Sequence, residues 1–162
     1  MQNTDITTIV MTAAFTAVFG YIANILLECR KFEMQQKAFL VSIRHELLVF
    51  KGVEITKIGT YLSRLVDGQQ RIVPFLYYDR FPVFSSVIKR IGIIRDDTLI
   101  EKIISCYSQI LSLTCSLKIM DFCVGRPAQE LEVYVNVQKK ILQQISESID
   151  DVILRIDSVV KK

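Results

Sequence analysis

The sequence predicts an all-α protein: an N-terminal transmembrane helix that continues into a cytoplasmic bundle of four to five helices, with a long heptad-patterned helix at the C-terminus. Two observations carry this prediction. Residues 6–27 contain no charged side chain, and apolar residues in the rest of the chain recur at steps of three and four. No stretch alternates apolar and polar residues as a half-buried strand does. The predicted domains are the N-terminus with its span, residues 1–29, and the helical bundle, residues 30–162.

The apolar run is predicted to remain in the chain as a membrane anchor. As a helix, residues 6–27 span about 33 Å, enough to cross a hydrocarbon core of about 30 Å. A secretory signal carries basic residues before its apolar core, whereas the first basic residue here is Arg30, after the run. The remaining alternative, a core helix of a water-soluble protein, is disfavoured because no face of the run is polar.

The charges beside the run predict its orientation and a lipid-facing surface. Asp5 is the only charged side chain before it, while residues 30–95 hold 12 Lys or Arg against 5 Asp or Glu. The positive-inside rule then places the N-terminus outside and the rest of the chain in the cytoplasm. The basic residues nearest the membrane are expected to face anionic lipid; a solvated basic face without a partner is the alternative. These residues are Arg30, Lys31, Lys37 and Arg44.

One face of the anchor carries small and polar residues. Ala13, Ala17, Gly20 and Asn24 follow one another at steps of four, three and four, so they share a side of a helix. Small residues let two membrane helices approach closely, and a buried Asn can hydrogen-bond its copy. We therefore predict a homo-oligomer that assembles through this face, although small residues are also common in membrane helices generally.

The helices after the anchor are predicted from apolar spacing and from helix-ending residues. The first extends the anchor up to a break at Gly52, and the second covers residues 53–66 and ends at Gly68. Residues 68–82 form an aromatic connection that is expected to cover the core, with a binding loop as the alternative. The expected buried positions of the first two helices are Phe32, Phe39, Ile43, Leu47, Phe50, Ile55, Ile58, Leu62 and Leu65.

Two longer helices follow. A short helix from Pro82 to about Arg90, capped by Gly92, leads into a helix that Asp96 or Asp97 caps and that Thr98 and Glu101 support as a capping box. Its buried side is predicted from Leu99, Ile103, Tyr107, Ile110 and Leu117, and it ends near residue 124. Gly125 and Pro127 separate it from the last helix.

The last helix has the clearest periodicity of the chain. Steps of four and three define a seam in which Gln138 is the only polar member. The seam is predicted to pack within the bundle or against neighbouring subunits, with the second half pairing with copies of itself. Its members are Leu131, Val135, Gln138, Leu142, Ile145, Ile149, Val152, Ile156 and Val159.

The sequence contains no constellation that predicts catalysis, a cofactor or a metal. His45 is the only histidine, and neither a Walker-type nor a dinucleotide-binding glycine motif is present. Glu130 and Glu132 have no partner histidine three residues on, and Asp150 and Asp151 are expected on a solvated face. The four cysteines are predicted to be reduced, buried thiols in the cytoplasm: Cys29, Cys106, Cys115 and Cys123.

A non-enzymatic scaffold or pore is therefore the expected function, with membrane lipid, copies of the chain and a cytosolic effector protein as partners. The alternative is a membrane-tethered module that binds nucleic acid through the basic half. Nucleic acid is not expected as a partner, because the basic residues are spaced singly and aromatic residues do not alternate with them.

The order of segments over residues 30–123 resembles a recurring group of small bacterial membrane proteins of unknown function. A span is followed by "KAFLVSIRHELLVF", by "FPVFSSVIKRIGII", and by a helix with a tyrosine, "LIEKIISCYSQILSL". The resemblance implies a single-pass protein of the bacterial inner membrane, and it implies no catalytic residues.

The layout is also similar to the membrane accessory proteins of Cas13b CRISPR systems. This resemblance implies an oligomeric, pore-like protein of antiviral defence with a helical domain akin to HEPN folds. HEPN nucleases have four to six residues between an arginine and the histidine that follows it. The arginines before His45 are Arg44 and Arg30, so a HEPN-like fold here is expected to lack RNase activity.

Overall fold

The computed structural model describes residues 2–66, 89–120 and 128–161. Within these ranges the backbone is helical apart from a connection at residues 94–96 and a final turn, which confirms the predicted all-α class. The chain divides into two compact units, Met1–Ala38 and Phe39–Lys162. The predicted boundary after residue 29 concerns the membrane and stays a prediction.

The first half of the chain contains no break at Gly52. Helix α1 covers Gln2–Val49, a π-helical segment η1 covers Phe50–Ile55, and α2 covers Thr56–Val66. The predicted break is wrong because the backbone widens into a π turn at Gly52 and stays helical. The Thr56 hydroxyl donates to the Gly52 carbonyl at 3.2 Å, which satisfies an acceptor beside the wider turn.

The π segment keeps the buried residues before and after it on one side of the helix. Phe50 and Ile58 are both buried although eight residues separate them. Eight residues of α-helix would rotate the second side chain by about 80° relative to the first. A π turn takes up one extra residue per turn, so it removes most of this rotation.

Deleting Gly52 is therefore expected to leave unit Phe39–Lys162, called the helical unit below, folded. The deletion makes Phe50 and Ile58 seven residues apart, close to two α-helical turns, and it removes a helical glycine that costs about 1 kcal/mol. Deleting the exposed Gln144, in the middle of the last helix, is the control, and it should cost several kcal/mol by turning buried residues outward. Denaturation followed by circular dichroism checks both; equal losses of stability would contradict the role given to the π segment.

The second half of the chain contains two long helices, α4 over Asp97–Met120 and α5 over Ala128–Val160. Asp96 caps α4, since its Oδ1 accepts a hydrogen bond from the Leu99 amide at 3.0 Å. The predicted Thr98–Glu101 capping box is wrong, because Thr98 already lies inside the helix. Gly92 lies within the 3-10 turn η3, Ile91–Ile93, and not at the predicted helix end.

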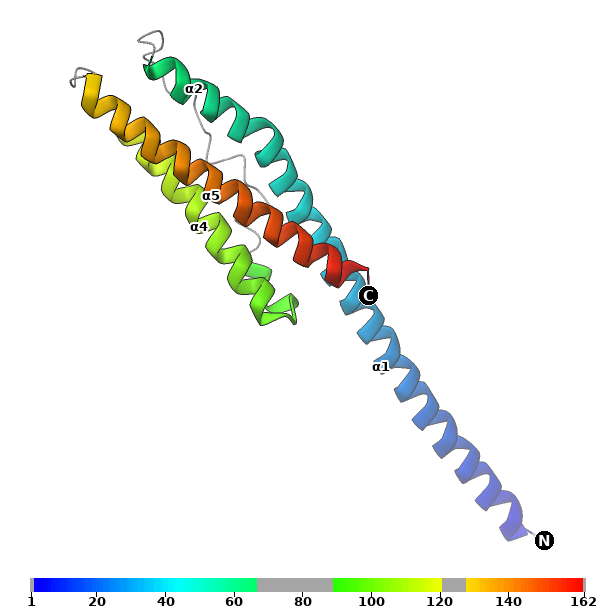
Figure 1. Ribbon diagram of the computed structural model, residues 1–162. Coiled ribbons are helices and arrows are strands. Elements are labelled where there is room, and N and C mark those ends of the chain that lie inside the picture. The colour runs from blue at the N-terminus through cyan, green and yellow to red at the C-terminus, as the bar shows by residue number, and fades with distance from the viewer. Residues whose placement is uncertain (1, 67–88, 121–127, 162) are drawn as a thin grey trace. The chain divides into compact units, whose positions relative to one another are not determined.

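In unit Phe39–Lys162, α5 runs antiparallel to both of its neighbours. Arg155 near its end contacts Asp96 at the start of α4, and Gln138 near its beginning contacts Ser116 near the end of α4. Figure 1 shows α5 between α4 and α2. Helix α4 therefore runs parallel to α2.

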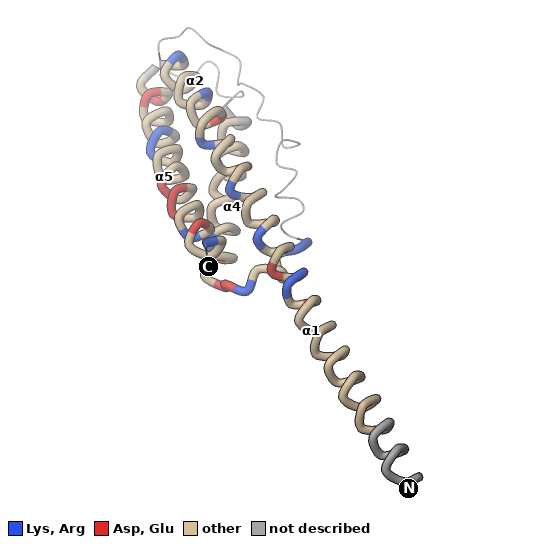
Figure 2. The backbone as a smooth tube through the Cα atoms, turned by 90° about the vertical axis from the view of Figure 1, so that its right-hand side faces the viewer, with Lys and Arg blue, Asp and Glu red and all other residues tan. Residues whose placement is uncertain are grey.

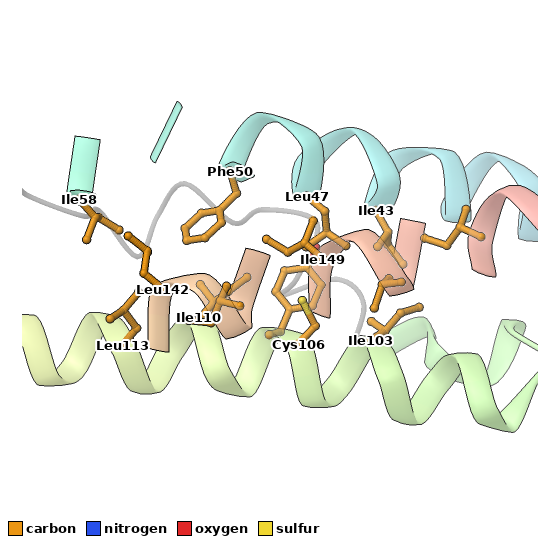
Figure 3. Close-up of a cluster of buried hydrophobic side chains, with 14 of the residues drawn as sticks. Ile43, Leu47, Phe50, Ile58, Ile103, Cys106, Ile110, Leu113, Leu142 and Ile149 are labelled. Atoms are coloured by element: carbon orange, nitrogen blue, oxygen red, sulfur yellow. The ribbon is translucent and has the colours of Figure 1, made fainter. Parts of the chain in front are cut away.

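The core of this unit lies where α1, η1 and α2 face α4 and α5. Leu47, Ile103 and Ile149 point into it from three helices, as Figure 3 shows. The buried side predicted for α4 is confirmed at all five positions. The predictions at Gly68, residues 68–82, Gly125 and Pro127 lie outside the described residues. The buried hydrophobic residues are Leu40, Ile43, Leu47, Phe50, Ile58, Tyr61, Leu62, Ile94, Leu99, Ile103, Cys106, Tyr107, Ile110, Leu113, Leu117, Val135, Leu142, Ile145, Ile149, Val152 and Ile156.

Candidate membrane anchor and contacts of the helical unit

The N-terminal part of α1 is the one described helix long and apolar enough to cross a membrane. Its apolar window has no residue buried within the protein. Figure 2 shows this part of the helix without a blue or red residue until the first charges follow it. The exposed large side chains are Met11, Phe15, Val18, Phe19, Tyr21, Ile22, Ile25, Leu26 and Leu27.

All four residues of the predicted assembly face are exposed: Ala13, Ala17, Gly20 and Asn24. A Cβ placed on Gly20 would meet no atom of the described residues within 4 Å. Thr16, nearby, donates its hydroxyl to the Thr12 carbonyl at 2.8 Å, which lets a polar side chain sit in a hydrocarbon environment.

The basic residues predicted to face lipid fall into two groups. Arg30, Lys31 and Lys37 are exposed, and Lys31 pairs with Glu28 at 3.6 Å. Arg44 differs, since its Nε donates to Asp157 of α5 at 2.8 Å and its side chain is half-buried. Arg44 therefore holds α1 to α5, a role that the sequence pattern did not predict.

Further ion pairs join the described helices of unit Phe39–Lys162. Lys51 pairs with Asp150 at 2.5 Å, Lys102 with Asp151 at 2.6 Å, and Arg155 with Asp96 at 2.7 Å. Asp150 and Asp151 are exposed, as predicted, yet each holds a lysine of a different element. Exposed pairs of this kind contribute about 0–1 kcal/mol each. The Lys51–Asp150 pair, together with Arg44–Asp157, also reduces the basic charge that residues 30–95 offer to nucleic acid.

The carboxylate of Asp96 is held in its charged form. The hydrogen bond from the Leu99 amide lowers its pKa below the usual value, and Arg155 adds to the effect against the opposing influence of burial. A carboxyl with a lowered pKa stabilises the fold above its unfolded pKa, and this stabilisation is lost as the pH falls through the folded pKa.

Asp96→Ala is expected to lower the free energy of unfolding by about 1 kcal/mol at pH 7, because it removes the helix cap and the partner of Arg155. The difference in the free energy of unfolding between this variant and the unchanged chain should decrease in acid, as the Asp96 carboxylate becomes protonated. Urea denaturation of the detergent-solubilised chain at pH 7 and pH 3 measures both. Asp97→Ala, an exposed neighbour in the first turn of α4, is the control, and an equal loss there would contradict the assignment of the cap.

Polar contacts also connect the helices near or within the core. The Tyr107 hydroxyl, on α4, donates to Glu46 Oε2 on α1 at 2.5 Å. Burial and the negative charge of Glu46 raise the pKa of Tyr107, so the phenol stays protonated. Burial also raises the pKa of the adjacent Cys106 thiol to about 11, against a weaker opposing hydrogen bond from Ser148.

The polar member of the α5 seam, Gln138, is buried and paired. Its Oε1 accepts from the Ser116 hydroxyl at 3.1 Å, and the Tyr134 hydroxyl donates to the Ser116 carbonyl at 2.9 Å. Among the described residues, no buried side-chain nitrogen or oxygen lacks a hydrogen-bond partner. A satisfied polar group in an apolar seam favours one alignment of the two helices over shifted ones.

The seam of α5 is covered within the same chain. Leu142, Ile145, Ile149, Val152 and Ile156 are buried, and Val159 is partly buried. The described part of the chain therefore leaves no free second half of this seam for pairing with copies. The reason is that α5 lies between two helices, which cover it along its length.

The remaining candidate residues lie apart from one another. His45 is exposed, and Cys29 and Cys115 are exposed where burial was predicted, because both occupy outward positions of their helices. No group of three metal-ligating side chains occurs in residues 2–66, 89–120 and 128–161. Comparisons with protein-family models, curated proteins and solved structures return no match for this chain. The resemblances described above therefore remain predictions.

Proposed function

We propose that the chain is a membrane-anchored, non-enzymatic scaffold that assembles with copies of itself and presents its helical unit in the cytoplasm. The observation that carries the proposal is the uncovered apolar stretch of α1. Large side chains such as Phe15, Tyr21 and Leu27 are exposed there on all sides of the helix. In water this surface would cost about 25 cal/mol for each Å² left uncovered, whereas lipid solvates it.

The charges near the anchor support the proposed orientation. Arg30, Lys31 and Lys37 lie on the C-terminal side of the apolar stretch and are exposed. Cations on this side favour the cytoplasmic leaflet, where anionic lipid contributes about 1 kcal/mol per basic residue near the surface. The helical unit that follows would then lie in the cytoplasm.

The assembly face supports self-association. Ala13, Ala17 and Gly20 have small or no side chains, so a neighbouring helix could approach their backbone closely. Asn24 continues the same face, and an amide in hydrocarbon is stabilised when it hydrogen-bonds a partner. All four residues are exposed in a single chain, which leaves a second copy as the proposed neighbour.

Native mass measurement of the full-length chain, extracted in mild detergent, tests the proposal. We expect a mass well above one chain that does not change on moderate dilution. Gly20→Leu together with Asn24→Leu should reduce it, because the first prevents close approach and the second removes the interhelical hydrogen bond.

Ile22→Phe is the matched control, since it enlarges a side chain on the opposite side of the anchor and should leave the mass unchanged. A single-chain mass for the unchanged protein would refute self-assembly. An equal reduction in the control would refute the assignment of the face, though not assembly itself.

A further inference from the structure

We infer that a second copy of this chain also packs against the side of α1 and η1 that faces away from the core of unit Phe39–Lys162. The contact residues are Val41, His45, Leu48 and Gly52, which we name the outward seam. This inference rests on the proposed self-assembly, and it extends the contact from the anchor to the cytoplasmic part of the chain.

The outward seam is apolar or small and open to solvent. Val41 is 48% exposed and Leu48 is 39% exposed. His45 and Gly52 are exposed as well, and a Cβ on Gly52 would meet nothing within 4 Å. The opposite side of the same helix is fully buried at Leu40, Ile43 and Leu47. This helix therefore has two apolar sides, and the described helices of its own chain cover only one of them.

The spacing of the outward seam continues that of the anchor's assembly face. From Ala13 to Gly52 the chain can be followed at alternating steps of four and three without a skipped position, the pattern of a coiled-coil seam. One position carries a charge, Lys31, and its ammonium pairs with Glu28 at 3.6 Å. The positions are Ala13, Ala17, Gly20, Asn24, Leu27, Lys31, Met34, Ala38, Val41, His45, Leu48 and Gly52.

The charges beside the outward seam are neutralised within the chain. Arg44 and Lys51 flank it seven residues apart, so in a pair of copies they would place like charges along the contact. Asp157 and Asp150, also seven residues apart on α5, pair with them at 2.8 and 2.5 Å. This match of charges lets two copies approach without the repulsion that two unpaired basic rows would produce.

A second copy in parallel orientation fits these features better than a different protein. Both copies enter from the same membrane, so each seam residue meets its own counterpart. The outward seam contains no Asp, Glu, Lys or Arg that would select a charged partner. Leu154 is the most exposed large hydrophobic residue of α5, but it forms no apolar surface of this kind, because the charged residues Asp150, Asp151 and Arg155 surround it in the helix.

Disulfide cross-linking in native membranes tests the inference. The background is the full-length chain with Cys29→Ser, Cys115→Ser and Cys123→Ser, which keeps the buried Cys106. Val41→Cys and Leu48→Cys are oxidised separately with copper phenanthroline. We expect disulfide-linked dimers at both positions, forming several-fold faster than with Leu154→Cys, whose parent side chain is 72% exposed and therefore more accessible.

Equal or slower dimer formation at Val41→Cys and Leu48→Cys than at Leu154→Cys would overturn the inference. If the native mass still exceeds one chain in that case, the anchor alone assembles and the proposed function stands. A cross-linked product that is not a multiple of the chain mass would assign the seam to another protein and would also overturn the inference. Leu48→Glu gives an independent check, since it should lower the oligomer mass while Leu154→Glu leaves it unchanged.

Discussion

Removing residues 1–29 is expected to move the chain from the membrane fraction to the soluble fraction. The ten Leu, Ile, Val and Phe residues in this stretch each favour the bilayer by about 0.3 to 0.6 kcal/mol, which sums to about 3 to 6 kcal/mol over the span. The compact unit Phe39–Lys162 is retained in the shortened chain. Membrane sedimentation followed by an alkaline carbonate wash measures the distribution.

A full-length variant separates the effect of the apolar surface from that of chain length. Val18→Arg together with Ile22→Arg keeps every position but places two charges near the centre of the span. Each costs about 2.5 to 3.5 kcal/mol there, so membrane insertion should fall sharply. If the shortened chain stayed in the membrane fraction after the wash, another part of the protein would have to bind lipid and α1 would not be the anchor.

Ile149→Ala is expected to lower the free energy of unfolding of the helical unit by about 2 to 5 kcal/mol. Ile149 is fully buried in the core, where it faces residues of both α1 and α4. Its truncation loses apolar burial and leaves a cavity that three helices cannot easily close. The loss is large compared with the total stability of a typical domain, about 5 to 15 kcal/mol.

Leu154→Ala is the control for this substitution, because it removes a similar side chain from the same helix at a position that is 72% exposed. We expect a change within about 0.5 kcal/mol. Urea denaturation monitored by circular dichroism compares the two variants with the unchanged chain. Similar losses for both would mean that the packing of α5 differs from the one described.

Helices whose apolar residues lie on one side only were predictable from the sequence. In α5 the charged residues all lie off the seam, so the buried side followed directly from the spacing of residues such as Ile145 and Ile149. The buried side of α1 after residue 38 was harder to predict, since apolar residues are adjacent in the sequence there. Phe39 was predicted to be buried, but its neighbour Leu40 is fully buried and Phe39 only partly.

Features that depend on contacts between distant segments were not predictable. Nothing in the local sequence places Arg44 beside Asp157, more than a hundred residues away, or Asp150 beside Lys51. The π turn was missed for a related reason. A glycine is the usual sign of a helix end, and only the shared burial of Phe50 and Ile58 requires the helix to continue through Gly52.

The candidate site was predictable in part. The apolar stretch and the positions of Ala13, Ala17 and Gly20 follow from composition and spacing, and the single chain leaves all of them uncovered. The outward seam was not predicted from the sequence, because His45 and Gly52 interrupt its apolar residues. Its exposure depends on which side of α1 the other helices pack against, and this cannot be read from the spacing of residues in α1.

The reactivity of the buried Cys106 thiol can report when the helices of unit Phe39–Lys162 separate. With a pKa of about 11, roughly one thiol in ten thousand is ionised at neutral pH, and the side chain has no exposed surface. An alkylating reagent would therefore modify Cys29 and Cys115 rapidly, and Cys106 only when the helices separate. The rate of this slow modification would measure how often the helices of unit Phe39–Lys162 separate in the full-length chain.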